Sequence, residues 1–181
     1  MARLVLYLFI IATTVISCKQ EPTLQTYFVE NQDKKDFMVV DVSSDILNLE
    51  KNTLTPQQEK VLKSFDKLNV LAFKPDFKNK ENQAKYEAEK QKITTILKDK
   101  KYQELIKVGS GKNQMQLSFT GDENAIDEFI LYGNQKETGF AVVRILGNDM
   151  KPENALEFIS ILQNSNLNLE ELKGLQEFIK K

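Results

Sequence analysis

The sequence predicts an α+β fold, a two-layer sandwich in which helices lie mainly on one face of a mixed sheet of about five strands. Three observations lead to this prediction. Strand-like and helical segments alternate through the first part of the chain, three strand-like segments then follow one another across short turns, and helical segments end the chain. Consecutive strands joined by short turns are typical of an antiparallel meander, so the sheet is expected to end in one.

The first part of the chain reads as a strand–helix–strand unit. Residues 36–42 form a near-continuous apolar run, as in a strand that is covered on both faces. Thr55, Pro56 and Gln58 are typical of a helix start, because threonine can cap, proline suits the first helical position and Gln58 completes a capping box. Residues 69–74 form the second strand, which the following proline ends.

Further helices are expected on both sides of this unit. A short helix begins near Tyr27, and the longest helical pattern runs from about Asn79 to Lys100. This pattern continues over residues 102–106 and ends at the glycines of residues 109–111, since glycine is common at helix C-termini. The two C-terminal helices are expected to begin at Pro152 and Asn168.

The meander begins with a strand of alternating character at residues 114–119. Its polar residues Gln114, Gln116 and Ser118 alternate with apolar ones, which predicts that one sheet face is solvated near this strand. The remaining turns are expected at residues 120–124 and 133–138, and the strands that follow them at residues 126–132 and 139–146.

The N-terminus is predicted to be a lipoprotein signal peptide. After Arg3, residues 4–16 are uncharged and mostly apolar, a run that is too short to span a membrane and typical of a secretory signal. The run ends in two apolar residues, Ser17 and Cys18, the pattern of a bacterial lipobox. We therefore expect cleavage between Ser17 and Cys18 and lipidation of the Cys18 thiol. An ordinary cleaved signal followed by a chance cysteine is the alternative.

These assignments predict the domain organisation. Residues 1–17 are expected to be removed, residues 18–25 to form a lipidated N-terminus and short tether, and residues 26–181 to fold as a single domain close to the bilayer. Several acyl chains on one cysteine hold a protein in a membrane. We expect the protein to lie in the cell envelope, anchored in the outer membrane. The sequence leaves two orientations, with the domain on the periplasmic side or on the cell surface.

Composition excludes several kinds of catalytic site. The chain has no histidine and one cysteine. Histidine-dependent triads and imidazole metal sites are therefore impossible, and lipidation of Cys18 would also exclude disulfides and structural zinc sites. Residues 109–112 resemble part of a phosphate-binding loop, but Asn113 replaces the required serine or threonine. No enzyme activity and no cofactor are expected.

Charge is nearly balanced but unevenly distributed. The chain has 25 lysines and arginines against 26 acidic residues. Lysines dominate residues 78–112 and acidic residues dominate residues 122–177, which suits a membrane surface or a polar partner as well as ordinary solvated faces. Because arginine is scarce and no platform of basic and aromatic residues is present, nucleic acid is not an expected partner.

Two sets of acidic residues are candidate sites. In an up-down-up meander, the turn after residue 120 and the strand end near residue 149 share one sheet edge. This brings Asp122, Glu123 and Asp149 together as oxygen donors for a weak Ca²⁺ site, with Asx turns and a helix cap as the structural alternative. Asp127 and Glu128 are adjacent on a strand, so they point to opposite faces and cannot share one substrate.

Arg144 is the other candidate site residue. It lies in a strand that is otherwise apolar. A covered arginine needs a carboxylate partner, because an unpaired buried charge is very costly. The sequence therefore leaves two roles open for Arg144, a structural ion pair and the binding of an anionic ligand.

Several of these features together resemble one protein family. They are the lipobox, the run at residues 101–108 with its glycine turn, the meander, and the strand end at residues 143–148. The chain is similar over residues 26–162 to the Bacteroidetes lipoproteins catalogued as domain of unknown function 4252. The resemblance implies an envelope location and a single domain, with a loose link to envelope signalling, and it implies no catalytic residues.

The expected function is therefore a non-catalytic binding or envelope-sensing module, held at the membrane by lipid on Cys18. Its expected partner is an envelope protein or a small ligand. A structural envelope component that acts through assembly is the first alternative. A hydrolase that relies on carboxylates, serine or lysine is the second.

Overall fold

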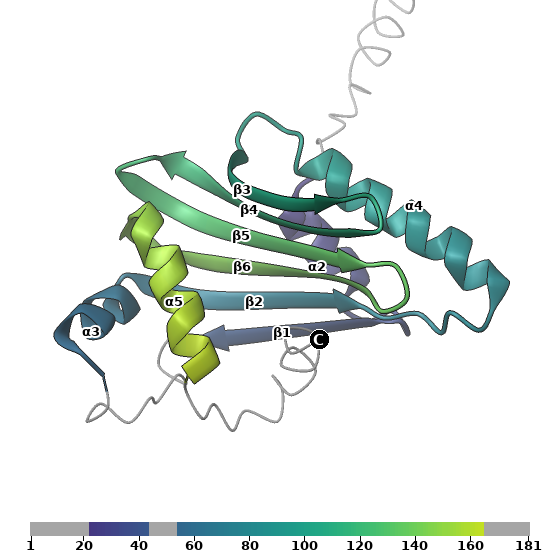
Figure 1. The fold of residues 1–181 in the computed structure, drawn as a ribbon, viewed down its shortest axis with the longest axis horizontal. Coiled ribbons are helices and arrows are strands. Elements are labelled where there is room, and N and C mark those ends of the chain that lie inside the picture. Colours follow the sequence, from purple (N-terminus) through teal and green to yellow (C-terminus); the bar gives the residue numbers. More distant parts are fainter. Residues whose placement is uncertain (1–21, 44–53, 165–181) are drawn as a thin grey trace, which may run out of the picture.

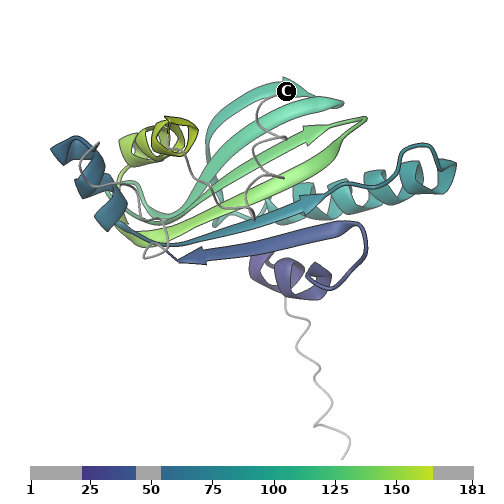
Figure 2. The same ribbon diagram turned by 90° about the horizontal axis from the view of Figure 1, so that it is seen from below.

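The computed structural model describes residues 22–43 and 54–164, which form one antiparallel sheet with helices on both of its faces (Figures 1 and 2). The elements are α2 (Leu24–Asn31), β1 (Phe37–Ser43), α3 (Pro56–Lys63), β2 (Phe65–Phe73), α4 (Lys80–Ile96), β3 (Gln103–Ser110), β4 (Asn113–Asp122), β5 (Ala125–Gln135), β6 (Gly139–Met150) and α5 (Pro152–Asn164). The helix expected at Asn168 lies outside the described residues.

The sheet has six strands in the order β1-β2-β6-β5-β4-β3, and every neighbouring pair is antiparallel. The α+β class and the final three-strand meander, β4 to β6, are confirmed. The mixed sheet of about five strands is corrected to an antiparallel sheet of six. β6 pairs with β2 on its other side, so the meander continues into the first unit of the chain.

The additional strand is β3, which covers residues that the sequence pattern assigned to a helix. α4 ends at Ile96 with Leu97 as its C-cap, and β3 instead pairs with β4 through Ile106 opposite Leu117 and Val108 opposite Met115. Gly109 has a positive φ of 76°, and a Cβ there would lie 2.3 Å from the Asn113 carbonyl oxygen. The glycines therefore close a tight β3–β4 hairpin, and strand pairing overrides the helical spacing of the apolar residues.

Helices cover both faces of the sheet, which corrects the prediction that they lie mainly on one. Figure 2 shows α3 and α5 on one side of the sheet and α2 and α4 on the other. Alternate residues of β6 serve the two sides, since Val143 packs with α3 and α5 whereas Val142 packs with α2 and α4. We call these sides the α3/α5 face and the α2/α4 face. Continuous apolar runs in β2 and β6 require cover on both sides.

The expected helix starts are present with their caps. The Thr55 side chain accepts a hydrogen bond from the backbone N–H of Gln58 at 3.3 Å, and the Gln58 side chain accepts one from the Thr55 N–H at 2.9 Å. Pro56 occupies the first turn of α3, as predicted. Thr23 caps α2 and Asn79 caps α4 in the same way, with side-chain oxygens on backbone N–H groups.

Candidate functional site

Buried polar side chains concentrate on the α2/α4 face. The buried polar residues of the described strands lie opposite cross-strand partners whose side chains belong to this face. The remaining buried polar residues lie in α2 and α4. The set consists of Asn31, Asn69, Glu89, Gln116, Ser118, Asn134 and Arg144. A site that depends on buried polar chemistry would therefore lie on this face.

Arg144 lies in a structural ion pair. Its Nε donates to Glu128 Oε1 at 2.5 Å, and its Nη1 donates to Gln25 Oε1 at 2.5 Å. The guanidinium also lies over the Phe28 ring, 5.4 Å from its centre. The two charged side chains are only 7% and 12% exposed. The pair joins β6, β5 and α2, so the geometry favours the structural role of Arg144 over an anion-binding role.

A second paired carboxylate joins α2 to α4. The Tyr27 hydroxyl donates to Glu89 Oε2 at 2.7 Å, and Lys92 Nζ donates to Glu89 Oε1 at 2.7 Å. Burial raises the pKa of Tyr27 well above its usual value, and the hydrogen bond to the Glu89 carboxylate raises this pKa further. The Tyr27 hydroxyl is therefore a permanent donor at neutral pH, and both Glu89 oxygens are occupied.

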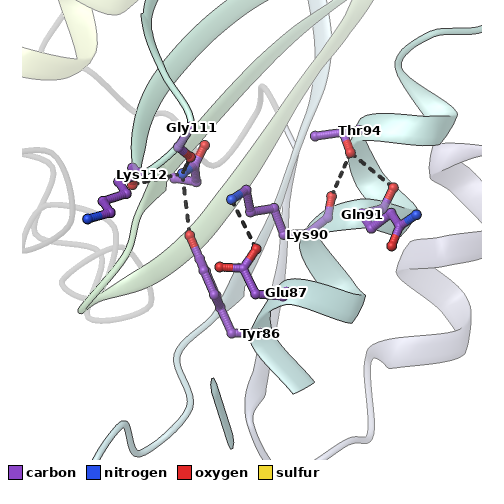
Figure 3. Close-up of polar contacts among 8 residues, drawn as sticks. Tyr86, Glu87, Lys90, Gln91, Thr94, Gly111 and Lys112 are labelled. Carbon is purple, nitrogen blue, oxygen red and sulfur yellow. Dashed lines mark hydrogen bonds and ion pairs between the residues drawn. The ribbon is translucent and has the colours of Figure 1, made fainter. Parts of the chain in front are cut away.

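Tyr86 of α4 lies beside Gly111 and Lys112 of the β3–β4 turn (Figure 3), and Asn134 connects the two elements. Its Nδ2 donates to Tyr86 Oη at 3.3 Å, to the Gly111 carbonyl at 3.2 Å and to the Lys112 carbonyl at 3.0 Å. Figure 3 also shows the Lys90–Glu87 ion pair on the neighbouring turn of α4. This network fixes the hairpin turn against α4 rather than leaving an open polar site.

Two polar atoms near this network have no hydrogen-bond partner among the described residues. They are the Tyr132 hydroxyl and the Oδ1 atom of Asn134. Burial raises the pKa of Tyr132, so its hydroxyl stays protonated at neutral pH. Buried polar atoms of this kind are normally satisfied by internal water. Among the described residues, the α2/α4 face thus has two buried polar atoms that an internal water could satisfy.

The predicted solvated row on β4 is corrected, because Gln116 and Ser118 are buried and Gln114 is half-buried. Gln116 is 9% exposed and Ser118 is fully buried. Their side chains satisfy one another, because Gln116 Nε2 donates to Ser118 Oγ at 3.0 Å, and Gln114 Nε2 donates to Gln116 Oε1 at 3.4 Å. The sequence alternation was correct, but the expectation of solvent was wrong because α2 and α4 cover this second face.

The candidate calcium residues do not form a metal site. Within residues 22–43 and 54–164, no group of three acidic side chains is arranged to hold a metal ion. The Asp122 side chain accepts a hydrogen bond from the Asn124 N–H at 2.9 Å, which is the Asx turn of the structural alternative. β5 separates the Asp122 and Asp149 ends of the meander, and Glu123 is an exposed residue of the turn. The described geometry therefore favours the Asx-turn alternative at Asp122.

The remaining candidates also have structural roles. Residues 109 and 110 end β3 and residues 111 and 112 form the β3–β4 turn, so this segment is a hairpin end and not a phosphate loop. Asp127 is exposed, whereas Glu128 belongs to the ion pair with Arg144. The two largely buried carboxylates, Glu89 and Glu128, are thus both paired to cations, and they are not arranged as a carboxylate pair that could share one substrate.

Exposed apolar side chains gather on the β3–β4 hairpin. Ile106 is 41% exposed, Val108 is 56% exposed and Met115 is 49% exposed. Val108 and Met115 are cross-strand partners, and Met115 continues the row of Leu117 on the α3/α5 face. We call Ile106, Val108 and Met115 the hairpin patch. The described chain has only two other large exposed apolar residues, Val29 on α2 and Leu156 on α5.

The hairpin patch was missed because its first strand was assigned to a helix. Two signals in the sequence indicate the hairpin. β-Branched residues at 106 and 108 favour a strand, and the glycines at 109 and 111 stand immediately before a second alternating segment. Read together, these signals predict a hairpin that exposes one side of β3.

The lipobox residues Ser17 and Cys18 lie outside the described residues, so the predicted cleavage and lipidation remain predictions. In the part of the chain that the structure describes, no helix combines the length and the apolar character needed to cross a bilayer.

No curated protein and no solved structure matches the chain. A family model described as Domain of unknown function (DUF4252) matches residues 27–158, which span the described sheet and its helices as far as α5. The match covers well over half of the chain, which therefore belongs to the DUF4252 family.

Proposed function

We propose that the protein is a lipid-anchored, non-catalytic binding module of the bacterial cell envelope, and that it contacts a protein partner through the hairpin patch. The observation that carries this proposal is the gathering of three exposed apolar side chains on one edge hairpin. Groups of exposed apolar residues on a folded domain commonly mark interaction sites.

The position of the patch adds a second means of recognition. β3 is the last strand of the sheet, and among the described strands only β4 pairs with it. Its outer backbone N–H and C=O groups can therefore pair with an extended segment of another chain, while Ile106 and Val108 offer apolar contacts. Lys107 and the register shift near Leu105 limit unselective pairing, as is usual for edge strands.

The buried polar groups of the α2/α4 face support a binding role over a hydrolytic one. Glu89 is held by Tyr27 and Lys92, and Glu128 is held by Arg144. A carboxylate that serves as a general acid or nucleophile needs access to substrate, and neither of these carboxylates has it. The lipid on Cys18 would raise the concentration of the module beside its membrane partners.

In-cell photo-cross-linking of the native lipoprotein tests the proposal. A photoreactive residue at position 108 is expected to cross-link one envelope protein, and the same residue at position 29 is expected to leave that protein unlinked. Val29 is the matched control because it is also an exposed valine, 55% against 56% exposed, but lies on α2. A Cys18→Ala chain, which cannot be lipidated, is expected to lose most of the product.

The identity of the cross-linked peptide decides between the alternatives. A second copy of this chain at position 108 would favour the assembly role instead. An intrachain product with residues 165–181 would assign the patch to the protein's own C-terminus and contradict the proposal. With the photoreactive residue moved to position 106, Val108→Ser should abolish cross-linking of the envelope protein. Val29→Ser should leave this cross-linking unchanged.

A further inference from the structure

We infer that the turn between α4 and β3 contacts anionic lipid headgroups and orients the domain on the bilayer, an inference that rests on the proposed lipidation of Cys18. The turn contains Lys98, Lys100 and Lys101, which are all exposed. We call these three residues the lysine turn. The lysine turn lies beside the N-terminal tether, so the lipid on Cys18 would hold its positive charges close to the bilayer.

A hydrogen bond places the start of α2 at this turn. The backbone N–H of Leu24 donates to the Tyr102 hydroxyl at 3.4 Å. Leu24 follows Cys18 by six positions along the chain, and six such steps span at most about 21 Å. A lipid on Cys18 must therefore lie within about that distance of Tyr102. The lysine turn directly precedes Tyr102, so it lies beside the point at which the anchor holds the domain.

The charge of the lysine turn is not neutralised by neighbouring acids. In the body of α4, Lys85 pairs with Asp36, Lys90 with Glu87 and Lys92 with Glu89. By contrast, none of the three lysines of the turn forms an ion pair with any described residue. The one acid within the turn is Asp99, so the segment has a net positive charge.

The turn also has a fixed conformation. The Asp99 side chain accepts a hydrogen bond from the Lys101 N–H at 2.9 Å, and the Tyr102 N–H donates to the Asp99 carbonyl at 3.0 Å. The Lys101 ammonium lies 5.0 Å from the centre of the Tyr102 ring. The lysines are thus presented from a rigid corner beside the tether. Cations at the C-terminus of α4 also favour the helix dipole, which is a structural contribution that the experiment must separate.

Anionic headgroups fit this corner in charge and in distance. Each lysine near an anionic membrane surface strengthens binding by about fivefold, and this attraction falls off within a Debye length. The acyl chains already retain the protein, so the lysines would set which side of the domain faces the bilayer. The hairpin patch belongs to the opposite, α3/α5 face of the sheet and would remain available to a partner.

Lysine footprinting of the full-length lipoprotein tests the inference. The protein is placed in vesicles of phosphatidylcholine, or of equal parts phosphatidylcholine and phosphatidylglycerol, and treated with an amine-acetylating reagent. We expect acetylation of the lysine turn to slow about fivefold in the anionic vesicles and to recover in about 1 M NaCl. Lys60 and Lys63 of α3, also exposed but on the other face, are the internal controls and should react equally in both.

Equal acetylation of the lysine turn in the two kinds of vesicle would overturn the inference. So would equal slowing at Lys60 and Lys63, because that would be a general effect of the charged surface. The triple change Lys98→Gln, Lys100→Gln and Lys101→Gln should leave the protein lipidated and folded. The acetylation rates of its remaining lysines should then be the same in both kinds of vesicle. The matched Lys60→Gln and Lys63→Gln variant should keep the difference.

A separate measurement distinguishes failure of the anchor from failure of the lysine turn. The mass of the N-terminal peptide reports whether Cys18 carries lipid, and an unmodified Cys18 would contradict the proposed function itself. Sedimentation of a chain of residues 19–181, which has neither the signal peptide nor the lipid, with the anionic vesicles then tests the lysines alone. We expect its binding to fall about tenfold or more in the triple variant. Unchanged binding would overturn the inference even if lipidation were confirmed.

Discussion

The two faces of the sheet are built from the same strands but use different chemistry. On the α3/α5 face, the buried side chains are apolar, including Phe129, Val143 and Ile145. On the α2/α4 face, tyrosines and all the buried polar residues of the described chain pack against the helices. Val143 and Arg144 are neighbours in one strand, yet they serve opposite faces. One face is therefore stabilised mainly by close packing and the other also by a hydrogen-bond network.

The largest loss of stability is expected from a cavity in the α3/α5 face. Phe129 is fully buried, with Phe119 and Ile145 as its cross-strand neighbours. Phe129→Ala should lower the free energy of unfolding by about 4 kcal/mol, because the surrounding sheet cannot close the space. Urea denaturation measures the loss, with Phe129→Leu as the milder control. A loss below about 1 kcal/mol would mean that this face is not close-packed.

The next largest loss is expected from the ion pair of the α2/α4 face. Arg144→Met removes the partner of Glu128 and leaves a carboxylate largely buried, which should cost about 3 kcal/mol. Adding Glu128→Met should recover most of that loss in a double-mutant cycle. If Arg144→Met were nearly neutral, the ion pair would not be structural and a ligand role for Arg144 would regain support.

A smaller effect should distinguish the faces by pH. Burial raises the pKa of Tyr27, Tyr86 and Tyr132, all of the α2/α4 face. Their stabilising contribution is complete below the unfolded-state pKa of about 10 and declines as pH rises above it, since the unfolded chain then ionises first. We expect a loss of about 1.4 kcal/mol per pH unit for each of Tyr27 and Tyr132, whose pKa values are raised most. Urea titrations from pH 8 to 11 measure it, and Tyr132→Phe should reduce the slope; an unchanged slope would contradict this assignment.

The smallest expected effect concerns the Tyr132 hydroxyl at neutral pH. Tyr132→Phe should change stability by less than about 0.5 kcal/mol, because this hydroxyl has no hydrogen-bond partner among the described residues. Tyr86→Phe is the matched control and should cost about 1 kcal/mol through the lost contact with Asn134. A loss above about 1.5 kcal/mol for Tyr132→Phe would instead indicate a tightly held internal water.

Much of this architecture could be predicted from the sequence where local signals agree. The capping residues Thr55 and Gln58 marked α3, and alternation and turns marked the meander from β4 to β6. The failures came where the signal was not local. Residues 103–110 satisfy helical spacing, and only their pairing with β4 makes them a strand. Alternation identified Gln116 and Ser118 as sharing a face but could not show that helices cover it.

The candidate sites show the same limit. The need of Arg144 for a carboxylate partner was predictable from its apolar strand, but the partner depends on the register of β5 against β6. The hairpin patch depends on β3 being an edge strand, which is a property of the whole sheet order. The sequence shows the lysine turn only as a group of positive charges. The hydrogen bond between Leu24 and Tyr102 shows that the turn lies beside the tether.

The pairing of β2 with β6 also has a consequence for how the chain folds. Short turns join β3 to β6, so the meander can form locally, whereas Leu71 meets Val142 only after a loop containing α4 and three other strands has closed. We expect Phe129→Leu to slow refolding and Val70→Ala to speed unfolding with little change in refolding; chevron measurements giving the reverse would contradict this order. β1 and β2 are synthesised first and can pair with one another, but the other side of β2 would then wait, unpaired, until β6 leaves the ribosome.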